Sequence, residues 1–131
     1  MLLYFNKMVI FFKFIFHTSL VFLILISIYP GSLIGYFLYN DLGKQPVLFK
    51  NYFGSNINHF LYYVYISLIG FFSHIKITKL FYLLFFLAII LETIQFTIPN
   101  RSFQLSDLIA NILGVIVAYC VIKIYLYFNK L

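Results

Sequence analysis

From Leu80 to Ile98 the chain reads LFYLLFFLAIILETIQFTI, and this run indicates that the protein folds in a lipid bilayer rather than in water. The run is nineteen residues long and holds only four polar side chains, one of which is the carboxylate of Glu92. A helix needs about 20 predominantly apolar residues to cross the hydrocarbon layer of a bilayer. The run therefore predicts a transmembrane helix over about residues 80–98.

The rest of the chain has the same character. Of its 131 residues, 64% are hydrophobic and 9% are charged, and the mean hydropathy is +1.03, whereas soluble domains are only about half apolar. Comparable apolar runs cover about residues 10–29, 57–75 and 108–128. We therefore predict an all-α membrane protein, a compact antiparallel bundle of about four transmembrane helices that forms a single domain over residues 1–131.

Breaks in the apolar pattern predict the connections between these helices. Pro30-Gly31 ends the first run, and the mixed composition of residues 30–56 predicts an interfacial or re-entrant loop. The short link around residues 74–79 makes the second and third helices a hairpin. Pro99 breaks the third helix, and Ser106-Asp107 is typical of the N-cap of a helix.

The basic residues predict the orientation of the bundle. Six of them fall on one side of the membrane in this layout and three on the other: Lys7, Lys13, Lys76, Lys79, Lys123 and Lys130 against Lys44, Lys50 and Arg101. Because basic residues concentrate in cytoplasmic segments, both termini are predicted to be cytoplasmic. The net charge of +6 then reflects topology and anionic head groups, so we expect membrane lipids as partners and no nucleic acid. The oligomeric state stays open.

Three of the predicted helices each carry polar and small residues on one face, because residues three or four apart share a side of a helix. The three faces are Ala88, Glu92 and Gln95; Asp107, Asn111, Gly114 and Ala118; and His59, Tyr63, Ile66 and Gly70. In the predicted topology the polar residues lie at the outer ends of the helices. The small residues Gly70, Gly114 and Ala118 lie deeper, where they allow close helix packing.

A buried carboxylate in this cluster needs a partner, because a charged side chain in the hydrocarbon region costs roughly 2.5–3.5 kcal/mol on insertion scales. Arg101, the only arginine, lies on the short turn after the third helix. We expect it to face Glu92 or Asp107, and its planar fork also suits a phosphate. A network that only fixes the register of the helices is the alternative.

The spacing of these polar residues resembles the C-terminal signature of the VanZ-like family. That signature reads E-x-x-Q, then R, then D-x-x-x-N-x-x-G, and the matching residues here are Glu92, Gln95, Arg101, Asp107, Asn111 and Gly114. The resemblance implies a small multi-pass protein of the bacterial cytoplasmic membrane. The founding member of the family contributes low-level resistance to the glycopeptide teicoplanin, so the resemblance also implies a role in the cell envelope.

An upstream element of the family, D-K-x-x-H-F-x-x-Y, is matched in part. His59, Phe60 and Tyr63 agree with it, whereas Ser55-Asn56 stand where the family has Asp-Lys. The chain therefore keeps the aromatic and histidine positions of this element and lacks its charged pair.

The function that we favour from the sequence is the binding of a lipid-linked or amphipathic anionic ligand, such as a lipid-linked envelope precursor, in an outward-facing pocket. The predicted ligand-binding residues are Arg101, Glu92, Gln95, Asp107, Asn111, His59 and Tyr63. Neutral amides have no useful proton to transfer, so Gln95 and Asn111 are expected to orient their neighbours.

Two other functions stay open. In an enzyme, Glu92 or Asp107 would act as a general base with His59 on a lipid head group. In a holin-like or accessory subunit, the cluster would only lock the helices or dock a partner. Three mixed ligands without a local metal motif do not make a convincing metal site, so we predict neither a metal nor a cofactor.

Overall fold

The computed structural model describes residues 2–44, 57–73 and 76–129. All regular structure in these residues is helical, and they contain no strand. The elements are α1 (Leu2–Ile28), α2 (Leu33–Tyr39), α3 (Ile57–Ser73), α4 (Ile77–Ile94), the 3-10 turn η1 (Gln95–Thr97) and α5 (Leu105–Phe128). The prediction of an all-α fold is confirmed.

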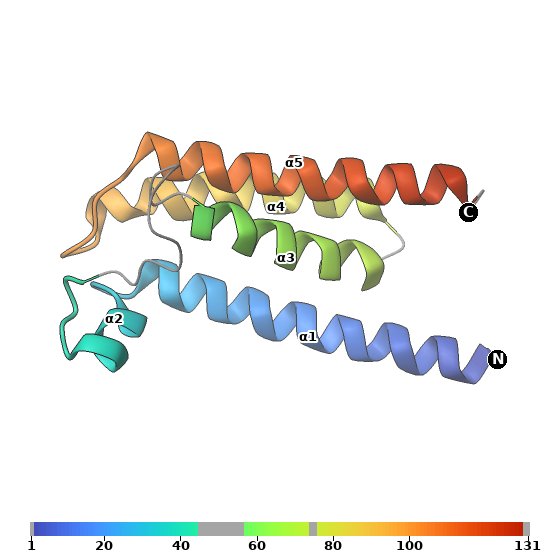
Figure 1. The fold of residues 1–131 in the computed structure, drawn as a ribbon, viewed down its shortest axis with the longest axis horizontal. Helices are drawn as coiled ribbons and strands as arrows, with labels where there is room; N and C mark the ends of the chain where they lie inside the picture. The colour runs from blue at the N-terminus through green and yellow to red at the C-terminus, as the bar shows by residue number, and fades with distance from the viewer. Residues whose placement is uncertain (1, 45–56, 74–75, 130–131) are drawn as a thin grey trace.

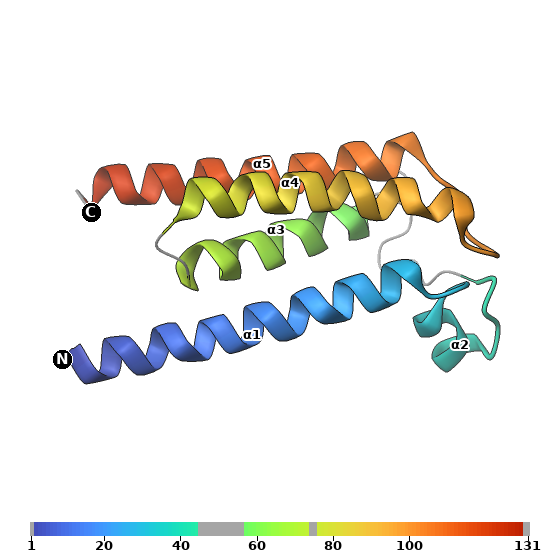
Figure 2. The same cartoon turned by 180° about the vertical axis from the view of Figure 1, so that it is seen from behind.

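The four longer helices form an antiparallel bundle. Figures 1 and 2 show α1, α3, α4 and α5 alongside one another, each running opposite to the one before it. The start of α1 and the end of α5 lie at one end of the bundle, and α2 lies at the other end, beside the end of α1 (Figure 1). In this bundle α3 packs chiefly against α5 and α1, and α4 packs chiefly against α5.

Small residues permit the closest contact, which is between α3 and α5. A Cβ atom on Gly114 would lie 2.7 Å from the Phe60 carbonyl oxygen and 2.9 Å from the Tyr63 Cβ atom. On the next turn of α5, Ala118 is fully buried. A Cβ atom on Gly70 would lie 2.7 Å from the ring of Phe16 on α1. The helices therefore approach at distances that larger side chains would prevent.

Within residues 2–44, 57–73 and 76–129, three helices are long and apolar enough to cross a membrane. Their candidate spans are Lys7–Ile28, Ile77–Thr97 and Leu105–Phe128. The fourth, α3, is apolar but has 17 residues, which corresponds to about 25 Å of helix against a hydrocarbon core of about 30 Å. Large apolar side chains on the surface, such as Phe14 and Phe86, suit contact with lipid. The structure thus supports a membrane protein, and four crossings stay a prediction.

Several predicted helix boundaries were wrong by a few residues. The first helix begins at Leu2 rather than near residue 10, and α4 begins at Ile77 rather than near residue 80. Apolarity marks the part of a helix that is buried in lipid, and polar turns can extend the helix beyond that part. The α-helix also ends at Ile94, and the chain continues through η1 to Ile98, which is extended because Pro99 follows it.

The predicted N-cap of the last helix was also wrong. Gln104 is the N-cap residue of α5, so Ser106 and Asp107 lie within its first turn. The backbone N–H of Gln104 donates to the Glu92 carboxylate, 3.3 Å away. A carboxylate from another helix therefore meets the N-terminus of α5, and the side chain of Asp107 is left to contact His59.

Residues 30–44 form a compact segment within the loop predicted over residues 30–56. Ser32 caps α2 by accepting a hydrogen bond from the N–H of Gly35, 2.9 Å away, and Asn40 ends the helix in the left-handed conformation. Some predictions lie outside the described residues. They concern residues 45–56, including Lys50 and the Ser55-Asn56 positions, residues 74–75 of the hairpin link, and Lys130.

Candidate ligand-binding pocket

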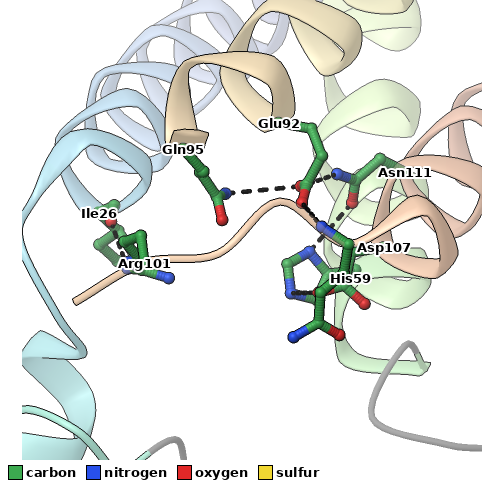
Figure 3. Close-up of polar contacts among 8 residues, drawn as sticks. Ile26, His59, Glu92, Gln95, Arg101, Asp107 and Asn111 are labelled. Carbon is green, nitrogen blue, oxygen red and sulfur yellow. Dashed lines mark hydrogen bonds and ion pairs between the residues drawn. The ribbon is translucent and has the colours of Figure 1, made fainter. Parts of the chain in front are cut away.

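Glu92 occupies the centre of a polar cluster at the end of the bundle where α4 ends and where α3 and α5 begin (Figure 3). Its side chain is 1% exposed. The Oε2 atom accepts hydrogen bonds from Asn111 Nδ2 at 3.2 Å and from Gln95 Nε2 at 3.5 Å. The Oε1 atom accepts the backbone N–H of Gln104 at 3.3 Å. Three uncharged donors from three segments therefore stabilise this carboxylate.

Asn111 links Glu92 to His59. Because its Nδ2 atom donates to Glu92, its other terminal atom, Oδ1, is an acceptor, and this oxygen lies 3.2 Å from His59 Nδ1. The hydrogen bond requires a proton on Nδ1. The contact with the amide oxygen thus favours a proton on Nδ1 in both the neutral and the charged form of His59.

The other ring nitrogen of His59 faces a carboxylate. His59 Nε2 lies 3.5 Å from Asp107 Oδ2, and the two side chains are 29% and 10% exposed. Because both ring nitrogens face oxygen acceptors, an imidazolium with two protons satisfies both contacts. The second oxygen of Asp107, Oδ1, is buried and has no hydrogen-bond partner among the described residues.

Arg101 does not pair with a carboxylate as the sequence predicted. Its Nη2 atom donates to the Ile26 carbonyl oxygen at 2.8 Å, and its Nε atom donates to the Tyr29 carbonyl oxygen at 3.4 Å. Figure 3 shows the side chain directed at the end of α1, away from Asp107. The prediction was wrong because the last carbonyls of a helix have no partner within the helix and attract a cation.

The charge of Arg101 is only partly compensated in this position. Burial lowers the pKa of its guanidinium, and the negative charge of Glu92 acts in the opposite direction. A guanidinium has five N–H groups, and two of those of Arg101 are used by the carbonyl oxygens of Ile26, in α1, and Tyr29, just after it. Three N–H groups therefore remain for a further acceptor.

A cavity of about 300 Å³ lies beside the cluster. Its walls come from α1, α2, α3, α4, α5 and the loop that carries Arg101. Among its lining residues are six of the seven predicted ligand-binding residues, namely His59, Tyr63, Glu92, Gln95, Arg101 and Asn111. Asp107 does not line the cavity and reaches it only through His59. The part of the lining that α1 and α2 supply is largely apolar and includes Leu23, Ile26, Leu33 and Leu38.

The contribution of α1 and α2 to this cavity was missed from the sequence. Ser27 and Ser32 line it, on either side of the Pro30-Gly31 break. Two hydroxyl groups beside a helix break and a short apolar segment were the available signal. The prediction considered only the last three helices, because only they carry charged residues at matching depth.

Among the described residues, no group of three or more histidine, cysteine, aspartate or glutamate side chains could hold a metal ion. His59 and Asp107 are in contact, whereas the oxygens of Glu92 face amide and backbone donors. The described side chains that line the cavity therefore include one cation with unused donors, Arg101.

Comparison with known proteins gives one informative match. Neither the curated proteins nor the solved structures contain a match to this chain. A family model described as VanZ/LLP1 matches residues 2–126, which covers almost the whole chain and includes every residue of the polar cluster. The protein therefore belongs to the VanZ/LLP1 family.

Proposed function

We propose that this protein binds an amphipathic anionic ligand in the cavity beside Glu92 and Arg101. The anionic group would accept hydrogen bonds from Arg101, and the apolar part would lie against α1 and α2. Asn111 and Gln95 hold Glu92 in place, and Asp107 orients His59 at the edge of the site. A membrane lipid or a lipid-linked envelope precursor has the required chemistry.

One observation carries this proposal. Arg101 lines a cavity whose other lining residues are largely apolar, and three of its N–H groups have no partner among the described residues. A half-buried cation with unused donors on the wall of a cavity suits an anion, because hydrogen bonds to charged groups are the strongest available in a site of low polarity. A site that only locked helices together would gain more from pairing Arg101 directly with Glu92.

The proposed membrane topology places this cavity on the outer side of the cytoplasmic membrane. We propose four crossings, with α3 as a short span, and both termini in the cytoplasm. Lys7, Lys76 and Lys79 lie at the end of the bundle that would face the cytoplasm, which agrees with the preference of basic residues for that side. Labelling of a cysteine introduced at Lys44 by an impermeant reagent in whole cells, with Cys120 replaced, would support this orientation.

Replacing Arg101 by alanine is expected to weaken ligand binding at least roughly tenfold, because a buried charge-assisted hydrogen bond contributes about 1.5–3 kcal/mol. Native mass spectrometry of the gently extracted protein measures this effect. The wild type should retain an anionic lipid adduct, or acquire one on titration with phosphatidylglycerol, and Arg101→Ala should not.

Lys44→Ala is the matched control, since Lys44 is an exposed cation at the same end of the bundle and does not line the cavity. This variant should keep the adduct. Equal adducts in all three proteins would contradict the proposal. Absence of any anionic adduct in the wild type throughout the titration would favour the accessory-subunit function instead.

The contact between His59 and Asp107 supports a second candidate, an enzyme that acts on a lipid head group. A histidine oriented by a carboxylate is a common general base. In this site, however, both nitrogens of His59 and both oxygens of Glu92 are already in hydrogen bonds or ion pairs. The geometry therefore supports binding better than proton transfer.

A Glu92→Gln variant separates the enzyme from the binding protein. If Glu92 is a general base, this variant should keep much of the ligand binding and lose turnover, which release of a head group from phosphatidylglycerol would reveal. Turnover equal to that of the wild type would exclude Glu92 as the base. A wild type without turnover would exclude the enzymatic function for this lipid.

We propose that this binding contributes to glycopeptide resistance in the cell, because the chain belongs to the VanZ/LLP1 family. Expression of the wild type in a sensitive Gram-positive host should lower its susceptibility to teicoplanin. Expression of Arg101→Ala at the same membrane level should not. Equal protection by both proteins would show that resistance does not depend on ligand binding in the cavity.

A further inference from the structure

The charges around the cavity limit the number of charges that its ligand can carry. This inference rests on the proposed function, because it concerns the ligand of the same cavity. Of the side chains described along its walls, Arg101, His59 and Glu92 can carry a charge near neutral pH. Asp107 adds a second carboxylate in contact with His59.

His59 and Asp107 balance each other. His59 Nε2 lies 3.5 Å from Asp107 Oδ2, so a protonated His59 is already paired with a carboxylate and offers little net charge to a ligand. An anion that approached His59 would also approach Asp107. The cation that is left to attract an anion is Arg101.

Arg101 and Glu92 line the same cavity without a direct ion pair. Among the described residues, the ion pair formed is that between His59 and Asp107. No nitrogen of Arg101 therefore lies within 4.0 Å of an oxygen of Glu92. Glu92 keeps its negative charge close to the cavity, because the groups that bind it are uncharged. With His59 protonated, the charges of Arg101, His59, Glu92 and Asp107 sum to zero, and with His59 neutral they sum to one negative charge.

A ligand with one negative charge fits this arrangement. That charge would be matched by Arg101, and the apolar wall would cover the rest of the molecule. A second negative charge would find on the described walls no further cation that lacks a carboxylate partner, since His59 contacts Asp107, and it would face Glu92. In a site of low polarity such repulsion is poorly screened.

We propose that the cavity selects amphiphiles that carry a single negative charge, such as a phosphodiester or a carboxylate, over those that carry two or more. A lipid carrier linked through a phosphodiester would be accepted on this basis. A carrier linked through a pyrophosphate, or a phosphomonoester in its dianionic form, would be disfavoured.

Phosphatidylglycerol and phosphatidic acid with the same acyl chains test this selectivity. The first carries one charge, and the second approaches two charges at about pH 8.5, because the second pKa of a phosphate monoester is near 6. In zwitterionic micelles at this pH, wild-type protein should bind phosphatidylglycerol at least roughly tenfold more tightly, as expected when like charges are juxtaposed. Oleate is the third ligand, and its affinity shows whether the cavity accepts a carboxylate as well as a phosphodiester.

Glu92→Gln tests the assigned cause, because it removes the negative charge and keeps the shape of the side chain. In this variant the preference for phosphatidylglycerol over phosphatidic acid should fall to about threefold or less. Should this variant not fold, the wild type at about pH 5.5 serves instead, since phosphatidic acid then carries about one charge and the preference should likewise shrink.

Three outcomes would overturn the inference. Phosphatidic acid binding as tightly as phosphatidylglycerol to the wild type at about pH 8.5 would refute the selectivity while leaving the proposed function intact. An unchanged preference in both Glu92→Gln and the lower-pH measurement would refute its assignment to charge. Binding of neither lipid above the level of phosphatidylcholine would refute the proposed function itself, and the selectivity with it.

Discussion

Gly114→Ala is expected to lower the free energy of unfolding by about 3 kcal/mol, at the upper end of what overpacking a well-packed core costs. The added Cβ atom would lie 2.7 Å from the Phe60 carbonyl oxygen and 3.1 Å from the Val64 nitrogen. Both are backbone atoms of α3, so no side chain can rotate to make room. The two helices that pack most extensively would have to move apart.

Unfolding in mixed micelles with increasing sodium dodecyl sulfate measures this loss, and two other glycines supply the comparison. At Gly43 a Cβ atom would meet only Asp41 Oδ1, at 3.4 Å, so Gly43→Ala should be close to neutral. At Gly70 the nearest atoms belong to the side chains of Phe16 and Leu80, which can shift, so Gly70→Ala should be intermediate. Equal stability of the Gly114 and Gly43 variants would contradict the close packing of α3 on α5.

Asn111→Leu is expected to lower the free energy of unfolding by about 3–5 kcal/mol, as when one partner of a buried charge is removed. The substitution removes the donor to Glu92 Oε2 and the acceptor for His59 Nδ1 together. Both side chains have the same branched arrangement of heavy atoms, although the two methyl groups of leucine are larger than the amide groups they replace. The loss would therefore come from a buried carboxylate that keeps only the donors of Gln95 and Gln104 and from an imidazole whose Nδ1 atom has lost its acceptor.

The same substitution at Asn129 controls for the change of residue type. Its amide donates to the Tyr125 carbonyl oxygen at the exposed end of α5, so Asn129→Leu should change the stability by less than about 1 kcal/mol. Adding Glu92→Leu to Asn111→Leu should recover part of the loss, because replacing both partners leaves no unpaired charge. A fully stable Asn111→Leu single variant would show that the amide does not support Glu92.

The polar cluster could be predicted from the sequence because helical periodicity alone brings its members together. Glu92 and Gln95 are three residues apart, and Asp107 and Asn111 are four apart, so each pair shares a face in any helix. The cost of a carboxylate in lipid then requires that these faces turn inward. The all-α fold follows from composition in the same way.

The partner of Arg101 could not be predicted by such local rules. Its hydrogen bond reaches Ile26, 75 residues earlier in the chain, and it depends on where the end of α1 lies in the folded bundle. The start of α5 was missed for a related reason, since the carboxylate of Glu92 binds the N–H of Gln104, twelve residues later, and competes with the local capping signal. Both errors concern backbone groups at helix ends, whose partners come from tertiary structure.

The position of the two chain ends affects how the protein can be handled. The start of α1 and the end of α5 lie together, at the end of the bundle away from the cavity (Figure 1). About 26 Å of α5 separates Phe128 from Asn111, the residue of this helix that lines the cavity, so a fluorescent protein or affinity tag fused there stands well away from the ligand. Both termini are therefore suitable attachment points for reporters, and a fusion that altered binding would act through the packing of the helices rather than by obstructing the mouth of the cavity.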